Sequence, residues 1–231
     1  MKRYFIISAF VLCSFTGWSQ SMNIHYKNGQ TVEYNMDNID YVEFTEKKQD
    51  NTQVSSEKAV DLGLSVKWAS YNVGATSPEE LGDKYAWGET SIKDKYNEET
   101  YVYYNSETQS YMDIGKDIGG TDYDAAHVKW GNGWRMPTYK EFNELKDNCE
   151  WKWTNFNGVN GYIVTGKNGN CIFIPPTIMW KDAYWASDLH VTREEGRGQK
   201  ARCYGISYDA IGNPVGMGRA AGNYIRPVHS K

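Results

Sequence analysis

Hydrophobic and polar residues alternate along much of the chain, a pattern typical of half-buried β-strands. Residues 22–35 read MNIHYKNGQTVEYN, with apolar side chains at alternate positions on both sides of Asn28-Gly29. An Asn-Gly pair favours a type I′ turn, because both central residues of that turn need a positive φ. The pattern therefore predicts a β-hairpin over 22–35. A third short strand over 39–44 would complete a small β unit, residues 20–44.

Residues 45–58, TEKKQDNTQVSSEK, contain a single apolar residue, Val54, and are predicted to be a polar linker. From Ala59 to residue 231 the chain is predicted to form one domain. Alternating or apolar segments predict its strands at 64–68, 150–155, 161–165, 171–174, 202–208 and 223–228. The Tyr-rich stretch 77–120 is expected to form loops with short strands.

A change of periodicity at Pro137-Thr138 predicts a helix. Thr138 can accept a hydrogen bond from the third amide of the helix while Glu141 reaches back to the Thr138 amide, which is a capping box. Phe142 and Leu145 then begin one apolar stripe that continues to residue 149. The helix is expected to end at Asp147-Asn148.

A shorter helix is predicted over 123–128, with Asp122 or Asp124 near its N-terminus. The two helices would form a corner, and we expect Trp130 and Trp134 to pack that corner. For Arg135 an ion pair with a helix carboxylate is favoured over a role as a ligand cation. Trp130, Trp134, Arg135, Thr138 and Glu141 are therefore assigned structural roles.

The N-terminus has the order of a secretory signal peptide. Lys2 and Arg3 precede an apolar run over 4–15, and small and polar residues follow. The run is shorter than the about 20 residues that a membrane-spanning helix needs. We expect residues 1–19 to be a signal peptide, and the rest to be exported to the periplasm, the outer-membrane surface or the extracellular space.

Charge narrows the class of partner. Without residues 1–19, 23 of the 25 Lys and Arg residues remain against 29 Asp and Glu, a net charge of about −6. Nucleic acids and anionic membranes select cationic surfaces, so neither is an expected partner. Cys149, Cys171 and Cys203 allow at most one disulfide, whose pairing stays open, and their spacing does not suit zinc.

The catalytic motifs G-x-S-x-G and H-E-x-x-H do not occur, and the four histidines are scattered along the chain. Residues 161–168, GYIVTGKN, approach a phosphate-binding loop, but Asn168 replaces the required hydroxyl and the segment is a predicted strand that enters a hairpin. The sequence Asp122-x-Asp124 has no glycine at the sixth position of a calcium loop. We therefore expect that the protein is not an enzyme and needs no cofactor. Calcium binding stays open, although no motif indicates it.

The segment 176–220 combines aromatic and charged residues with predicted loops, where rigid scaffolds place recognition residues. Trp180, Asp182, Tyr184 and Tyr208 are the candidate ligand-binding residues. Exposed rings there would stack on a sugar or a protein partner. The alternative, that Trp180, Tyr184 and Tyr208 only anchor loops, stays open. Trp185 is predicted to be a structural core residue.

An ordered set of motifs resembles a known family. The motifs are AVDLGLSVKWASYNVGA, YAWGET, DAAHVKWGNGWRMPTYKEFNEL, NGVNGYIVTGKNGNCIFIP, YWAS and GNYIRPV. They are similar to the Fibrobacter-type major paralogous domain (FISUMP), which occurs in exported bacterial proteins. The resemblance covers about residues 57–231. It implies no established reaction.

The third of these motifs is also similar, more distantly, to an element of formylglycine-generating-enzyme-like domains. This second resemblance implies an α+β, C-type-lectin-like domain with two short helices and a twisted antiparallel sheet. The copper-binding cysteine pair of that enzyme has no counterpart here, so its oxidation chemistry is not implied. The expected function is a non-enzymatic module that binds a glycan or a surface protein through its C-terminal loops. The alternative is a structural component of a cell-surface complex that assembles through the N-terminal β unit.

Overall fold

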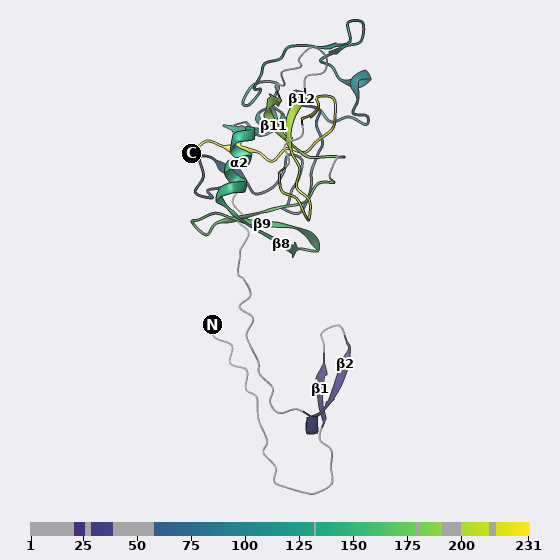
Figure 1. Cartoon of the computed structure of the whole chain (residues 1–231), viewed down its shortest axis with the longest axis vertical. Helices are drawn as coiled ribbons and strands as arrows, with labels where there is room; N and C mark the ends of the chain where they lie inside the picture. The colour runs from purple at the N-terminus through teal and green to yellow at the C-terminus, as the bar shows by residue number, and fades with distance from the viewer. Residues whose placement is uncertain are drawn as a thin grey trace. The chain divides into compact units, whose positions relative to one another are not determined.

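The computed structural model describes residues 21–25, 29–38, 58–131, 133–178, 181–190, 200–212 and 216–231. The chain divides into two compact units, Met1–Asn51 and Thr52–Lys231. Its described part is a mixed α+β structure with two α-helices and several small antiparallel sheets (Figure 1). The predicted signal peptide, the third strand at 39–44 and linker residues 45–57 lie outside the described residues.

The first unit contains the predicted hairpin. Strand β1 (Ser21–His25) pairs antiparallel with β2 (Thr31–Asn35), and the 3₁₀ helix η1 (Met36–Asn38) follows. Gly29 has a φ of +85°, a left-handed conformation that glycine adopts without steric cost. The alternation of apolar residues and the turn glycine thus place the hairpin correctly.

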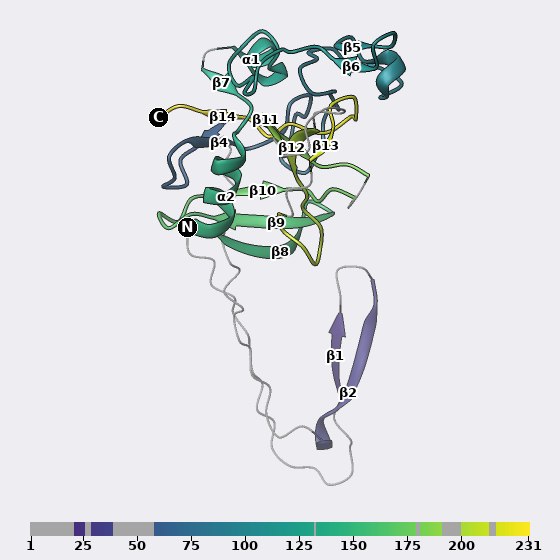
Figure 2. The same ribbon diagram turned by 45° about the horizontal axis from the view of Figure 1, so that its top comes forward.

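The second unit contains all the other elements (Figure 2). Its helices are α1 (Ala125–Trp130) and α2 (Tyr139–Asn148), with the 3₁₀ helix η2 at Glu98–Thr100. Its strands are β3 (Ala59–Val60), β4 (Lys67–Ala69), β5 (Tyr104–Asn105), β6 (Ser110–Tyr111), β7 (Trp134–Arg135), β8 (Glu150–Phe156), β9 (Val159–Thr165), β10 (Cys171–Ile174), β11 (Tyr184–His190), β12 (Lys200–Tyr204), β13 (Met217–Gly218) and β14 (Val228–His229). They form the sheets β3-β4-β14-β7, β10-β9-β8, β11-β12-β13 and β5-β6.

Helix α2 begins as predicted. The Glu141 amide donates to Thr138 Oγ1 over 3.2 Å, and the Thr138 amide donates to Glu141 Oε2 over 2.8 Å. Arg135 Nη1 donates to the same carboxylate over 2.9 Å, which confirms the predicted ion pair. Burial opposes ionisation of Glu141, but the hydrogen bonds from Arg135 and Thr138 outweigh it and lower the pKa of Glu141 below its ordinary value.

Helix α1 starts at Ala125 and ends at Trp130, so the predicted range 123–128 is displaced toward the N-terminus. Its N-cap is Asp124, which settles the choice between Asp122 and Asp124. The buried Asp124 carboxylate accepts hydrogen bonds from the amides of Gly120, Ala126, His127 and Met136. These bonds connect the N-terminus of α1 and the segment before α2 to one side chain. Burial outweighs them in its effect on ionisation and raises the pKa of Asp124.

Trp130 and Trp134 pack the corner as predicted, edge to face with ring centroids 5.0 Å apart. Trp185 is fully buried, and its indole N–H donates to the Tyr85 carbonyl over 2.7 Å. Its structural assignment is therefore confirmed. Together with Trp68 and Trp87 it is among the largest side chains of the core. Much of the tryptophan content thus contributes to packing.

Three strand predictions need correction. Strand β4 begins at Lys67 rather than residue 64, and β12 ends at Tyr204 rather than 208. After Tyr204 the chain turns back on itself, with Gly212 N donating to Gly205 O over 2.8 Å, so the strand cannot continue. In the range 223–228, isolated bridges at Asn223 and Tyr224 are followed by β14 at Val228–His229. Strand β11 was not predicted at all.

No helix in the described part of the chain combines the length and the apolar character required to cross a membrane.

Candidate functional site

The four predicted ligand-binding residues do not share an exposed face. Tyr184 is fully buried, and its hydroxyl donates to the Pro175 carbonyl over 2.7 Å. Of the two alternatives left open for Tyr184, a ligand-binding ring or an anchor, this burial favours the anchor, because the residue begins β11, a strand inside the core. Trp180 lies outside the described residues.

Asp182 is also buried, and the structure explains it as a loop anchor. One carboxylate oxygen accepts the Ile178 amide over 2.6 Å, and the other pairs with Lys84 Nζ over 2.9 Å. Both oxygens thus have partners within the protein. Asp182 shapes the turn that precedes β11, which leaves it poorly placed to bind a ligand.

Tyr208 is the predicted residue whose ring reaches solvent. It is 70% exposed and lies in a tight turn between Ser207 and Ala210. The Ser207 amide donates to the Ala210 carbonyl over 2.8 Å, and Ile206 and Ile211 form an antiparallel bridge at the base of the turn. The backbone that carries Tyr208 is therefore fixed by hydrogen bonds.

Two aromatic residues of the β8–β9 pair hold this turn in place. The Tyr162 hydroxyl donates to the Tyr208 carbonyl over 2.8 Å and lies 3.1 Å from the Ser207 carbonyl. The half-buried Trp153 ring meets the Tyr208 ring edge to face at 5.1 Å and the Tyr162 ring at 4.9 Å. Such aromatic pairs contribute about 0.5–1.5 kcal/mol each beyond the area that they bury.

The adjoining segment, residues 175–178, adds a second exposed apolar side chain. Ile178 is 60% exposed. Its neighbour Thr177 donates its amide to the Ile206 carbonyl over 2.7 Å, and the Ile206 amide donates to Thr177 Oγ1 over 3.1 Å. The two loops are therefore joined by backbone contacts. We name Trp153, Ile178 and Tyr208 the recognition patch.

Polar groups border the recognition patch. Ser207 Oγ donates to Asp209 Oδ1 over 2.9 Å at the tip of the same turn. Burial, with the Asp209 charge as a second cause, raises the pKa of Tyr162. The Tyr162 hydroxyl therefore keeps its proton and continues to donate to the turn at neutral pH. An apolar surface with a carboxylate and a hydroxyl at its edge is suited to contacts with an amphipathic ligand.

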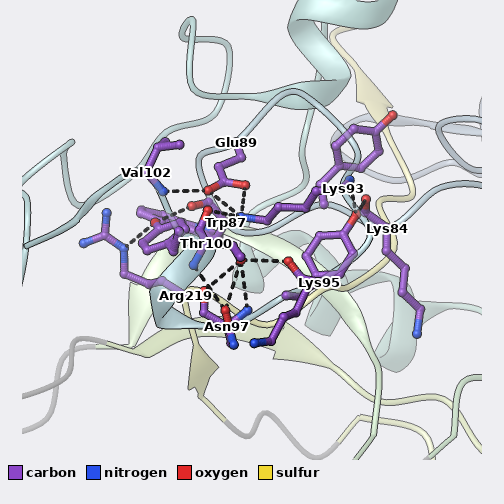
Figure 3. Close-up of polar contacts among 12 residues, drawn as sticks. Lys84, Trp87, Glu89, Lys93, Lys95, Asn97, Thr100, Val102 and Arg219 are labelled. Carbon is purple, nitrogen blue, oxygen red and sulfur yellow. Dashed lines mark hydrogen bonds and ion pairs between the residues drawn. The ribbon is translucent and has the colours of Figure 1, made fainter. Parts of the chain in front are cut away.

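A second group of aromatic and charged side chains is buried instead. Glu89 accepts hydrogen bonds from Lys93 Nζ over 2.8 Å and from the Val102 amide over 2.9 Å (Figure 3). The Tyr101 hydroxyl donates to the Trp87 carbonyl over 2.6 Å. These contacts fix the Tyr-rich loop to the Trp87-Glu89 segment.

Arg219 completes this group. Its Nε donates to the Tyr101 hydroxyl over 3.1 Å, and its Nη1 donates to the Met112 carbonyl over 3.0 Å. Its guanidinium carbon lies 5.0 Å from the Trp87 ring centroid, within the range of a cation–π contact. We name Trp87, Glu89, Lys93, Tyr101 and Arg219 the tyrosine brace. Its hydrogen bonds are internal, and it acts as a structural connection.

The motifs behind the family resemblance are largely structural. In GNYIRPV, the buried Asn223 side chain accepts the Ala183 amide over 2.8 Å. Arg226 donates to the carbonyls of Ala69 and Phe173 over 3.1 and 2.9 Å. Burial lowers the pKa of Arg226 to about 10, so it is still charged at neutral pH. These motif residues therefore hold neighbouring segments of the fold together through internal hydrogen bonds.

Burial raises the pKa of all three cysteines in the described part of the chain. Cys149, Cys171 and Cys203 are thiols. Burial raises the pKa of Cys203 to about 12 and that of Cys149 to about 11, so neither is a thiolate near neutral pH. Among the described residues, no group of three or more His, Cys, Asp or Glu side chains is placed to hold a metal ion.

Sequence reasoning missed Ile178 and Trp153 as members of the recognition patch. A signal for each exists in the sequence. Pro175-Pro176 ends β10 and directs the next residues into a loop, which favours exposure at Ile178. Trp151 and Trp153 alternate along the sequence, so they lie on the same face of their strand. This alternation does not show which of the two rings will contact the turn at residues 205–212.

Comparison of the chain with protein-family models, with curated proteins and with solved structures gives no match.

Proposed function

We propose that this protein is an exported, non-enzymatic binding module that recognises a glycan or a surface protein through the recognition patch. We further propose that residues 59–231 are a FISUMP-type domain with a C-type-lectin-like fold. The observation that carries the proposal is the Tyr208 ring, which is 70% exposed on a turn held by Tyr162 and Trp153. The motif resemblance supports the family and fold.

The physical reason lies in the cost of exposing a large ring. An isolated exposed apolar residue is ordinary, but Ile178 and Tyr208 lie on two segments joined by hydrogen bonds and offer apolar area that a partner could bury. Because the turn is already ordered, binding to Tyr208 loses little conformational entropy. A tyrosine ring also offers an apolar face to the C–H groups of a sugar and a hydroxyl at its tip.

The test compares single variants of the mature protein on a glycan array and in a pull-down from cell-surface extract. Tyr208→Ala and Ile178→Ala each remove one exposed side chain of the recognition patch. Ile92→Ala is the matched control, because Ile92 and Ile178 are both 60% exposed. We expect the first two variants to weaken binding of any captured ligand by about tenfold or more, and the control to leave it unchanged.

The same experiment separates the two ligand classes. A glycan ligand gives array signals that Tyr208→Ala abolishes, and a protein ligand gives a pull-down band that the variant loses. Ligand binding that Tyr208→Ala and Ile178→Ala leave as strong as in Ile92→Ala would show that the recognition patch is not the site.

A second candidate function is supported by the N-terminal hairpin. Its cross-strand pairs Met22–Tyr34 and Ile24–Val32 lie on one face, whereas polar residues occupy the other. Ile24 and Tyr34 are 38% and 40% exposed. A two-stranded hairpin with an apolar face is only marginally stable by itself. We propose as the alternative that the hairpin assembles with another protein of a cell-surface complex.

The assembly role can be tested by placing a negative charge on one face of the hairpin or on the other. Ile24→Asp introduces a carboxylate on the apolar face, and Asn23→Asp introduces the same group on the polar face. We expect Ile24→Asp, like deletion of residues 20–46, to release an assembly partner in a pull-down, and Asn23→Asp to retain it. A partner that all three variants retain equally would contradict the assembly role.

A further inference from the structure

A lysine ammonium lies against two tryptophan rings at the beginning of the second unit. Lys58 Nζ is 3.8 Å from the ring centroid of Trp130 and 5.6 Å from that of Trp134. Both distances are within the range of cation–π attraction, and the first is a close contact. The Lys58 side chain is exposed, whereas Trp130 is half-buried and Trp134 is buried. The two rings are therefore packed into the domain, and the Lys58 ammonium contacts them from the solvent side.

The rings form a preorganised corner. Trp130 and Trp134 meet at an interplanar angle of 89°, so they provide two perpendicular walls. Tyr71 contacts Trp130 edge to face at 5.5 Å, and His229 contacts Trp134 at 5.2 Å.

Separate elements of the fold hold these rings. Trp130 ends α1 and Trp134 begins β7, while His229 lies in β14, the neighbour of β7 in the sheet. Figure 2 shows α1, β7, β14 and β4 close together. Because several elements fix the rings, the corner does not depend on Lys58 to exist.

The Lys58 ammonium is held differently from other lysines of the domain. Lys84 and Lys93 each pair with a carboxylate, over 2.9 Å to Asp182 and 2.6 Å to Glu89. Within the described ranges no carboxylate forms such a pair with the Lys58 ammonium, which lies against the two tryptophan rings. Removing the cation from the rings would therefore break no ion pair within those ranges.

We propose that the corner formed by the Trp130 and Trp134 rings is a binding site for an alkylammonium ion, and that Lys58 occupies it as a displaceable internal ligand. Aromatic faces attract a quaternary ammonium or a lysine side chain through the same ring quadrupole that attracts Lys58. This site is separate from the recognition patch and does not rest on the function proposed above.

The experiment titrates the mature protein with choline as the probe. Calorimetry measures the dissociation constant, and nuclear magnetic resonance spectra record the indole N–H signals of the tryptophans. Lys58→Ala removes the internal ligand. Lys95→Ala is the control with the same charge change, because Lys95 is an exposed lysine whose ammonium pairs with Glu99 over 2.8 Å. Dimethylbutanol, the uncharged carbon analogue of choline, tests whether the positive charge is needed.

We expect Lys58→Ala to bind choline about tenfold more tightly than the unmodified protein and the Lys95→Ala variant, because the competing cation is gone. Choline should shift the indole signals of Trp130 and Trp134. The double variant Lys58→Ala with Trp130→Leu should lose this binding, and dimethylbutanol should not replace choline.

Three results would overturn the proposal. The first is that Lys58→Ala binds choline no more tightly than Lys95→Ala does. The others are that dimethylbutanol binds as tightly as choline, or that Trp130→Leu in the Lys58→Ala background leaves the affinity for choline unchanged. If Trp130→Leu unfolds the protein, Trp130→Phe keeps a ring with a weaker face and should reduce the affinity while circular dichroism stays unchanged.

Discussion

Tyr101 of the tyrosine brace is 3% exposed, whereas Tyr208 of the recognition patch is 70% exposed. The Tyr101 hydroxyl accepts a hydrogen bond from Arg219 and donates one to the Trp87 carbonyl, so its polar end is part of the core. Tyr208 is held by its backbone carbonyl and by one ring edge. Aromatic content alone therefore does not identify a binding surface. The groups that the hydroxyl contacts distinguish a structural tyrosine from one available to a ligand.

The largest expected effect comes from removing the charge at the centre of the tyrosine brace. Arg219→Leu eliminates the hydrogen bonds to Tyr101 and Met112 and the cation–π contact with Trp87. We expect it to lower the free energy of unfolding by roughly 3–5 kcal/mol, measured by urea denaturation.

Arg202→Leu is the matched control for that measurement. Arg202 pairs with Asp188 over 3.1 Å and stacks on Tyr139, but its side chain is 26% exposed. We expect a loss of about 1 kcal/mol or less, because solvent screens a partly exposed ion pair. If both variants lose the same amount, burial of Arg219 does not make the brace a major source of stability.

A smaller effect is expected from one hydroxyl of the brace. Tyr101→Phe keeps the ring but leaves the Trp87 carbonyl without its donor. The expected loss is about 1–3 kcal/mol, the cost of an unsatisfied buried polar group. Tyr111→Phe serves as the control, since its hydroxyl donates to the exposed Glu98 carboxylate over 2.6 Å and water can replace it. Equal melting curves for the two variants would contradict the special role of Tyr101.

Sequence patterns predicted the local parts of the fold and much less of the candidate site. The α2 capping box and the Arg135–Glu141 pair involve residues at most six positions apart, so their spacing carried the information. The brace joins Tyr101 to Arg219, 118 positions away. Such a contact depends on how several sheets pack, which one sequence does not reveal.

Tyr184 illustrates the same limit within the predicted site. Its sequence neighbours include charges and a second ring, a composition that a loop and a buried strand can share. The difference is made by distant contacts, namely the Pro175 carbonyl and the backbone bridge to Tyr224. For Tyr208 the sequence left the choice between a binding ring and a loop anchor open, and its strand pattern extended to residue 208; the 70% exposure of the ring follows from the turn that the Ser207–Ala210 hydrogen bond closes.

Alkaline pH should separate the buried tyrosines from the exposed ones. Burial raises the pKa of Tyr101 above its ordinary value of 10.0, and it raises that of Tyr184 to about 12. An unfolded chain therefore releases these protons at a lower pH than the folded chain. Stability is fully present below about pH 10 and falls as the pH rises toward the folded-state pKa, by about 1.4 kcal/mol per pH unit for each such tyrosine.

The Tyr101→Phe variant tests this assignment, because it has one raised pKa fewer. Its free energy of unfolding should fall less steeply above pH 10 than that of the unmodified protein, by about 1.4 kcal/mol per pH unit. Urea denaturation at several alkaline pH values measures the slope. Parallel slopes would mean that Tyr101 ionises as easily in the folded protein as in the unfolded chain.

The smallest stability effect is expected where the binding effect is expected to be largest. Tyr208→Ala removes a ring that is 70% exposed and leaves the carbonyl that Tyr162 holds. We expect its free energy of unfolding to change by no more than about 0.5–1 kcal/mol, since the main loss is one edge-to-face contact with Trp153. Tyr162→Phe, which keeps every exposed ring but frees the turn, should lose more stability than Tyr208→Ala. If instead Tyr208→Ala destabilised the protein as much as Tyr101→Phe, the Tyr208 ring would be a structural element like the brace, and the distinction between the two regions would disappear.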